Sequence, residues 1–167
     1  MAQKRVTAFR ETLQDLRPDT RTRAEYRSLF GVEPPPGIVA AQWRADRRVA
    51  RGRLAAGADL VDLEDLDVRR QLEESHAAML ASHDMRHLDI SHLRSSQRIV
   101  TQTIALDLWT DGKAGILYKS NLDGEACVAL FEGVATISPY GRPGTIPADD
   151  PDLLAAAEPW HLEIEHN

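Results

Sequence analysis

Four of the six histidines lie in one short stretch of the chain, and imidazole nitrogens are common zinc ligands. They are His76, His83, His87 and His92, and a spacing of four between His83 and His87 would place both rings on one face of a helix. No HExxH motif contains them, and no pair of cysteines accompanies them. We therefore interpret them as polar surface histidines and expect no metal site.

The remaining reactive residue types carry weak signals. The single cysteine, Cys127, lies inside an apolar run, which favours a buried and unreactive thiol over a nucleophile. The chain has no P-loop, no GxGxxG and no GxSxG motif. No common phosphate-binding or hydrolase motif therefore assigns a function.

Charge is distributed unevenly along the chain. Residues 1–53 hold twelve basic and six acidic side chains, whereas residues 54–167 hold eight basic and twenty acidic ones. A basic segment can face an anionic ligand, nucleic acid or an acidic partner, although a solvated helical surface is the simpler interpretation. No helix-turn-helix pattern surrounds the arginines of residues 44–53, so we expect no direct binding of nucleic acid.

Length and composition indicate a globular protein. A chain of 167 residues with 43% hydrophobic and 28% charged residues fits one domain over residues 1–167 with a substantial core. No apolar run is long enough to span a membrane, and the first residues lack the apolar segment of a secretory signal. We expect a cytoplasmic protein that makes no contact with a membrane.

In the first third of the chain, periodicity predicts helices. Val6, Phe9, Leu13 and Leu16 form one helical stripe that stops at Pro18, and residues 22–30 predict a second helix ending near Gly31. Residues 33–37 predict an extended loop because they contain three prolines. Residues 38–54 are ambiguous, with a possible edge strand over 49–54.

The rest of the chain mixes strands and helices. Residues 60–63, 115–118, 126–131 and 161–165 predict strands, the second and third being antiparallel neighbours. Helices are expected from about Asp65 through Met79, from a cap at Ser95 or Ser96 to Trp109, and over 152–158. Residues 88–93 and 139–151 predict connecting segments. The fold class is therefore α+β, a small mixed sheet with flanking helices.

One segment resembles a known family. Residues 112–133 read GKAGILYKSNLDGEACVALFEG and resemble the C-terminal signature of the RES domain, the toxin of bacterial pairs with Xre-type antitoxins. The matching positions are Gly115, Ile116, Tyr118, Ser120 and Phe131. The family pattern is a glycine, an aliphatic residue, a tyrosine and a serine, then a loop and an apolar strand that ends in phenylalanine.

The N-terminal resemblance is thinner. Residues 8–13 resemble the helix that carries an acidic residue of the family, and Glu11 would be that residue. The alternative for Glu11 is an ordinary exposed helix carboxylate. The family also has an arginine in an earlier strand, for which this chain has no counterpart, since Arg5 is too close to Glu11. We expect a RES domain that lacks its first strands, and the alternative is that another arginine of the chain serves in place of the family's arginine.

The resemblance implies a fold similar to ADP-ribosyltransferases and degradation of NAD, which is a substrate, so no cofactor is implied. It implies catalytic roles for Glu11 and Ser120, whereas substrate contacts by Tyr118 and Arg10 are our weaker expectation. Ser120 could instead only begin a turn, and Tyr118 could only pack. The implied partner is an Xre-type antitoxin, and a homo-oligomer is possible. The alternative is an inactive remnant that only binds a partner protein.

Overall fold

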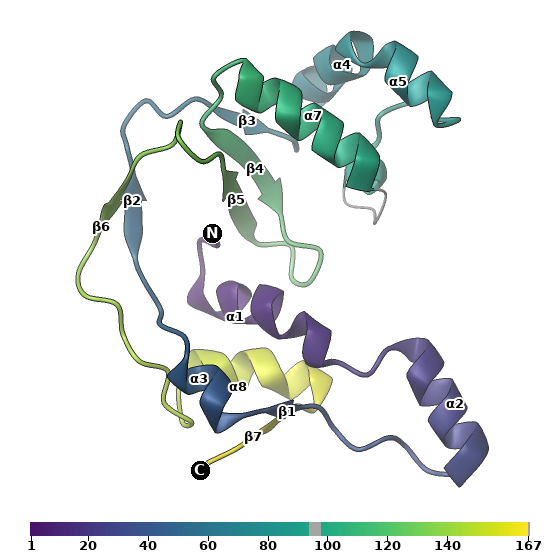
Figure 1. Ribbon diagram of the computed structural model, residues 1–167, viewed down its shortest axis with the longest axis vertical. Helices are drawn as coiled ribbons and strands as arrows, with labels where there is room; N and C mark the ends of the chain where they lie inside the picture. Colours follow the sequence, from purple (N-terminus) through teal and green to yellow (C-terminus); the bar gives the residue numbers. More distant parts are fainter. Residues whose placement is uncertain (94–97, 167) are drawn as a thin grey trace. The chain divides into compact units, whose positions relative to one another are not determined.

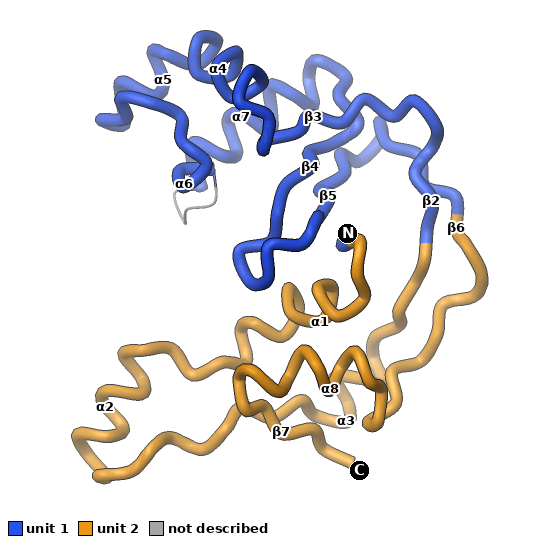
Figure 2. Tube along the Cα trace, turned by 180° about the vertical axis from the view of Figure 1, so that it is seen from behind, with its two compact units in different colours: residues 1–2, 52–138 blue, residues 3–51, 139–167 orange. Residues whose placement is uncertain are grey.

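The computed structural model describes residues 1–93 and 98–166. The expected cap at Ser95 or Ser96 lies outside these residues. The chain forms two compact units, shown in different colours in Figure 2. Unit 1 comprises residues 1–2 and 52–138, and unit 2 comprises residues 3–51 and 139–167. Each unit is thus built from segments that are far apart in the sequence.

Unit 1 is a three-stranded sheet with helices packed on it (Figure 1). Its strand order is β3 (Leu60–Asp62), β4 (Gly115–Lys119) and β5 (Ala126–Leu130), with β3 parallel and β5 antiparallel to β4. The parallel pair needs a long crossover. Helices α4 (Leu66–Ser75), α5 (Ala77–Ser82), α6 (Ile90–Leu93) and α7 (Arg98–Thr110) supply it.

The core of unit 1 lies between these helices and the sheet. Its buried apolar side chains are Val61, Leu63, Leu72, Leu80, Leu88, Val100, Ile104 and Leu108. At the start of β4 only glycine fits, since a Cβ on Gly115 would lie 2.3 Å from the carbonyl oxygen of Ala129. Residues Met1 and Ala2 lie against β5, where the amide of Val128 donates to the carbonyl of Met1 at 2.7 Å.

Unit 2 is mainly helical. Helix α1 (Arg5–Leu13), followed by the 3₁₀ turn η1 (Gln14–Leu16), lies beside α8 (Pro151–Ala157), as both ribbon and tube show (Figures 1 and 2). The other elements are α2 (Thr20–Phe30), β1 (Ile38–Val39), α3 (Ala41–Ala45), the 3₁₀ turn η2 (Glu158–Trp160) and β7 (Glu163–Ile164), with β1 parallel to β7. The core contains Phe9, Leu13, Val39, Ile146, Leu153, Ala156, Ala157 and Leu162.

Two short strands lie where the chain leaves and re-enters unit 2. Strand β2 (Gly52–Leu54) pairs with β6 (Ile137–Pro139) in a two-stranded sheet. The pairing continues beyond these strands, because Val49 forms a bridge with Gly144. Part of the predicted loop over 139–151 is thus paired to another segment.

The α+β class, with small sheets and flanking helices, is confirmed, and so are most predicted elements. Helix α2 ends at Gly31, whose φ of 71° glycine adopts without strain. Two details were wrong. The helix expected from Asp65 through Met79 is interrupted at His76, and the segment 88–93 contains the short helix α6.

His76 also corrects our interpretation of the histidines as surface residues. It is buried, with Nδ1 2.9 Å from the carbonyl oxygen of Leu72 and Nε2 2.9 Å from Asp107 on α7. His83 and His87 are exposed and His92 is half-buried. Among residues 1–93 and 98–166, no three histidine, cysteine, aspartate or glutamate side chains gather as metal ligands.

Candidate functional site

Glu11 and Arg10 belong to unit 2 and are carried by α1. Phe9 and Leu13 anchor this helix in the core, at 4% and 0% exposure. Glu11 lies off that apolar stripe, as predicted, and is half-buried. The Arg10 Nη2 donates to the carbonyl oxygen of Ala155 on α8 at 3.4 Å. The carboxylate is therefore held on a helix whose own position is determined by packing.

Tyr118 and Ser120 belong to unit 1. Tyr118 lies on β4 opposite Cys127 of β5 and is half-buried. Cys127 is buried, which confirms the expected environment of the thiol. Ser120 follows the last residue of β4 and is only 2% exposed.

The hydroxyl of Ser120 takes part in the turn between β4 and β5. Its Oγ accepts a hydrogen bond from the amide of Leu122 at 3.1 Å. Its backbone amide donates to Glu125 at 2.8 Å, and its carbonyl accepts from Gly124 at 2.9 Å. Serine at this place stabilises the local backbone, as in other serine turns. Ser120 therefore does take part in a turn, which the sequence had left open. A catalytic role for Ser120 stays a prediction.

The candidate residues therefore come in two pairs. Arg10 and Glu11 are neighbours on α1 of unit 2, and Tyr118 and Ser120 are near neighbours at the end of β4 in unit 1. Within its own unit each pair is positioned by one element, α1 for the first pair and the end of β4 for the second.

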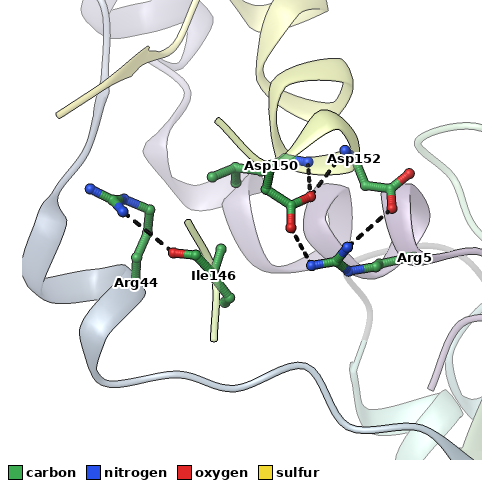
Figure 3. A network of polar contacts seen from close by, with 6 residues as sticks. Arg5, Arg44, Ile146, Asp150 and Asp152 are labelled. Carbon is green, nitrogen blue, oxygen red and sulfur yellow. Dashed lines mark hydrogen bonds and ion pairs between the residues drawn. The ribbon is translucent and has the colours of Figure 1, made fainter. Parts of the chain in front are cut away.

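Sequence reasoning missed an ion-pair network around Arg5 in unit 2 (Figure 3). The guanidinium of Arg5 is paired with Asp150 and lies 3.5 Å from Asp152. Asp150 is buried and also caps α8, where its Oδ1 accepts from the amides of Asp152 at 3.0 Å and Leu153 at 3.2 Å. The pattern Asp-Pro-Asp before an apolar run signals such a cap, but nothing local indicates that Arg5 is its partner.

Arg44 is a second buried arginine of unit 2. Its Nη1 donates to the carbonyl oxygen of Ile146 at 3.3 Å (Figure 3), and its Nη2 donates to the carbonyl of Glu165. These bonds tie α3 to the C-terminal segment that contains β7. Arg44 therefore has a structural role, and the arginines from 44 to 53 do not act as one uniform exposed group.

A pocket of about 470 Å³ lies beside α1 in unit 2. Helix α1 contributes Arg5, Ala8, Phe9 and Thr12 to its lining. Trp43 also lines it, with the guanidinium carbon of Arg47 4.6 Å from its ring centroid. The lining combines the Trp43 ring with Arg47, Arg48 and the carboxylate of Asp46, a combination suited to a planar polar group.

Comparison with known families identifies the chain. The family model of the RES domain matches residues 1–149, which include Glu11, Tyr118 and Ser120. The chain belongs to the RES domain family, which is associated with NAD-degrading toxins of toxin–antitoxin pairs. No match was found among curated proteins or among solved structures.

The match extends over most of both compact units. In the part of the chain that the structure describes, no helix is long and apolar enough to cross a membrane.

Proposed function

We propose that this chain is a toxin that degrades NAD by breaking the bond between nicotinamide and ribose. The observation that carries the proposal is the family match over residues 1–149, which includes both Glu11 and the Tyr118–Ser120 segment. NAD is the substrate, and no cofactor is needed.

Cleavage of the nicotinamide–ribose bond requires the protein mainly to stabilise a positive charge on the ribose. As the glycosidic bond breaks, its electron pair goes to the pyridinium nitrogen, so nicotinamide leaves neutral and needs no proton. The ribose becomes an oxocarbenium-like cation, which a carboxylate stabilises. An oxygen of water or phosphate then bonds to the ribose carbon, and water gives up a proton. The product is ADP-ribose, or its 1-phosphate if phosphate attacks.

We assign the carboxylate role to Glu11, which is held half-buried on a helix fastened by Phe9 and Leu13. Ser120 is the second catalytic candidate, because a hydroxyl can hold a ribose or phosphate oxygen. Tyr118 would stack on the nicotinamide, and Arg10 would contact a phosphate. The first two assignments rest on the family pattern, whereas those of Tyr118 and Arg10 are our weaker proposal.

The proposed partner is an Xre-type antitoxin that blocks the site, because a cell must protect its own NAD from such an activity. We place the protein in the cytoplasm, where NAD is available. Self-association into a homo-oligomer belongs to the same proposal and is testable by light scattering.

The test is NAD consumption by the purified chain, with and without phosphate. We expect Glu11→Gln to slow consumption by about a hundredfold or more, because an electrostatic stabiliser of the transition state is lost. The matched control is Glu74→Gln on α4, an exposed carboxylate that should leave the rate unchanged. Equal rates for the parent and Glu11→Gln would refute the assignment of Glu11.

The burial of Ser120 favours a second candidate function, that of an inactive domain which only binds a partner protein. At 2% exposure, with Oγ accepting from Leu122, this hydroxyl is occupied by the turn. Absence of NAD consumption by the folded parent, combined with retained binding of the antitoxin, would support this second function.

A further inference from the structure

A second pocket of unit 2, of about 310 Å³, is lined by three arginines. They are Arg5, Arg51 and Arg142, and Tyr140 and Gly141 also line the pocket. These residues come from three distant parts of the chain. From the sequence, Arg51 stood out only within the basic segment 44–53, and Tyr140, Gly141 and Arg142 were not singled out.

The pairing of two backbone segments builds this pocket. The amide of Tyr140 donates to the carbonyl of Arg51 at 2.8 Å, and Val49 and Gly144 exchange hydrogen bonds of 2.9 and 2.8 Å. Between these points one segment has a single residue and the other has three, residues 141–143. The longer side must bulge, and Gly141 permits this with a φ of 76°.

Charge in the pocket is only partly neutralised. Arg5 is paired with Asp150 and Asp152, so its charge is largely compensated. Arg51 and Arg142 are exposed and form no ion pair with any residue in 1–93 or 98–166. Two uncompensated guanidinium groups therefore line a single concave surface.

We propose that this pocket binds a phosphate or diphosphate group. Two guanidinium groups can each donate two parallel hydrogen bonds to phosphate oxygens and balance a doubly charged anion. Tyr140 also lines the pocket, and a tyrosine hydroxyl can donate a hydrogen bond to a phosphate oxygen. The two guanidinium groups would repel a cation.

The ligand has two possible sources with the same chemistry, free phosphate or the diphosphate of a nucleotide. The proposal concerns binding alone and does not rest on NAD cleavage, so a chain that leaves NAD intact would still bind the anion. Conversely, an active enzyme without this binding would overturn the inference and leave the proposed function standing.

Isothermal titration calorimetry with inorganic phosphate, pyrophosphate and ADP tests the pocket, at low ionic strength. We expect Arg51→Gln and Arg142→Gln each to weaken binding about tenfold, because each removes a charge-assisted contact. The matched control is Arg86→Gln, an exposed arginine of unit 1, which lowers the net charge equally and should leave the affinity unchanged.

The outcomes are distinct. Binding of phosphate as tight as that of ADP identifies free phosphate as the ligand, and tighter binding of ADP and pyrophosphate identifies a diphosphate. Both support the pocket if the two pocket variants are weakened and Arg86→Gln is not. No binding of any probe by the parent, or equal weakening in all three variants, overturns it. Circular dichroism of each variant confirms that it is folded.

Discussion

Ser120 in unit 1 and Asp150 in unit 2 are both buried polar side chains that accept hydrogen bonds from backbone amides. They differ in whether the fold must also supply a counter-ion. Ser120 accepts from Leu122 and is neutral, so the turn after β4 uses the hydroxyl and needs no counter-ion. Asp150 accepts from Asp152 and Leu153 and is charged, so it needs a cation.

The counter-ion of Asp150 is Arg5, whose positive charge is neutralised by this ion pair within the fold. Arg51 and Arg142, in the same pocket as Arg5, have no such partner among the residues that the structure describes and are available for a ligand. The comparison teaches that the presence of a suitable residue type is a weak sign of function. What matters is whether the fold has already engaged its polar atoms.

The largest effect should follow from Asp150→Ala. It removes the cap of α8 and leaves the partly buried Arg5 without its main partner, so we expect a loss of about 3 kcal/mol of unfolding free energy. Urea denaturation followed by circular dichroism measures it. A loss below about 1 kcal/mol would contradict the anchoring role.

Asp150→Asn separates the two contributions, because asparagine still caps the helix but carries no charge. It should cost less stability than Asp150→Ala and should tighten phosphate binding, since the charge of Arg5 is released. Calorimetry with phosphate checks the second point. Weaker binding by this variant would show that the charge of Arg5 does not reach the pocket.

A smaller effect is expected for Ser120→Ala. The amide of Leu122 loses its acceptor, which should lower the unfolding free energy by about 1 kcal/mol. Urea denaturation gives this value, and near-ultraviolet circular dichroism shows the folded fraction to which NAD consumption is normalised. Full activity per folded molecule would assign Ser120 to the turn alone, and loss of activity at unchanged fold would assign it to catalysis.

The smallest effects concern two carboxylates, one in each unit. The amide of Leu88, with a lesser contribution from His87, holds the pKa of Glu73 below its usual value. A hydrogen bond from Arg27, with a lesser contribution from Arg23, lowers the pKa of Glu33. Salt screens exposed ion pairs, so added salt should raise the pKa of Glu33 more than that of Glu73. Carboxyl chemical shifts followed by NMR check this order, and equal salt responses would contradict it.

The sign of the pH dependence follows from these directions. A carboxyl whose pKa is lower in the folded protein stabilises the fold above the pKa of the unfolded chain, about 4.3 for glutamate. That contribution is lost as the pH falls through the lower pKa of the folded state. Both units should therefore lose stability on acidification below about pH 4.3, which thermal melting at pH 3 and pH 6 tests.

The local elements were predictable because their signals lie within a few residues of one another. The stripe Val6, Phe9, Leu13 and Leu16 predicted one helix that stops at Pro18, since a helical period places these side chains on one face. The structure forms α1 there and continues it as the 3₁₀ turn η1. The two apolar runs around Asn121 and Gly124 predicted the β4–β5 hairpin, because a short loop favours antiparallel neighbours. The off-stripe position of Glu11 followed from the same period.

Tertiary structure decided what distant residues do together. His76, where the helix is interrupted, contacts Asp107 on α7, and the pairing of β3 with β4 joins segments more than fifty residues apart. Arg5 meets Asp150 across 145 positions, and residues 49–51 meet 140–144 to form the arginine pocket. The hydrophobic period that predicts each helix or strand lies within that segment of the sequence. Which buried charge finds which partner depends on how the core brings the elements together, and that decides which arginines remain available to bind a ligand.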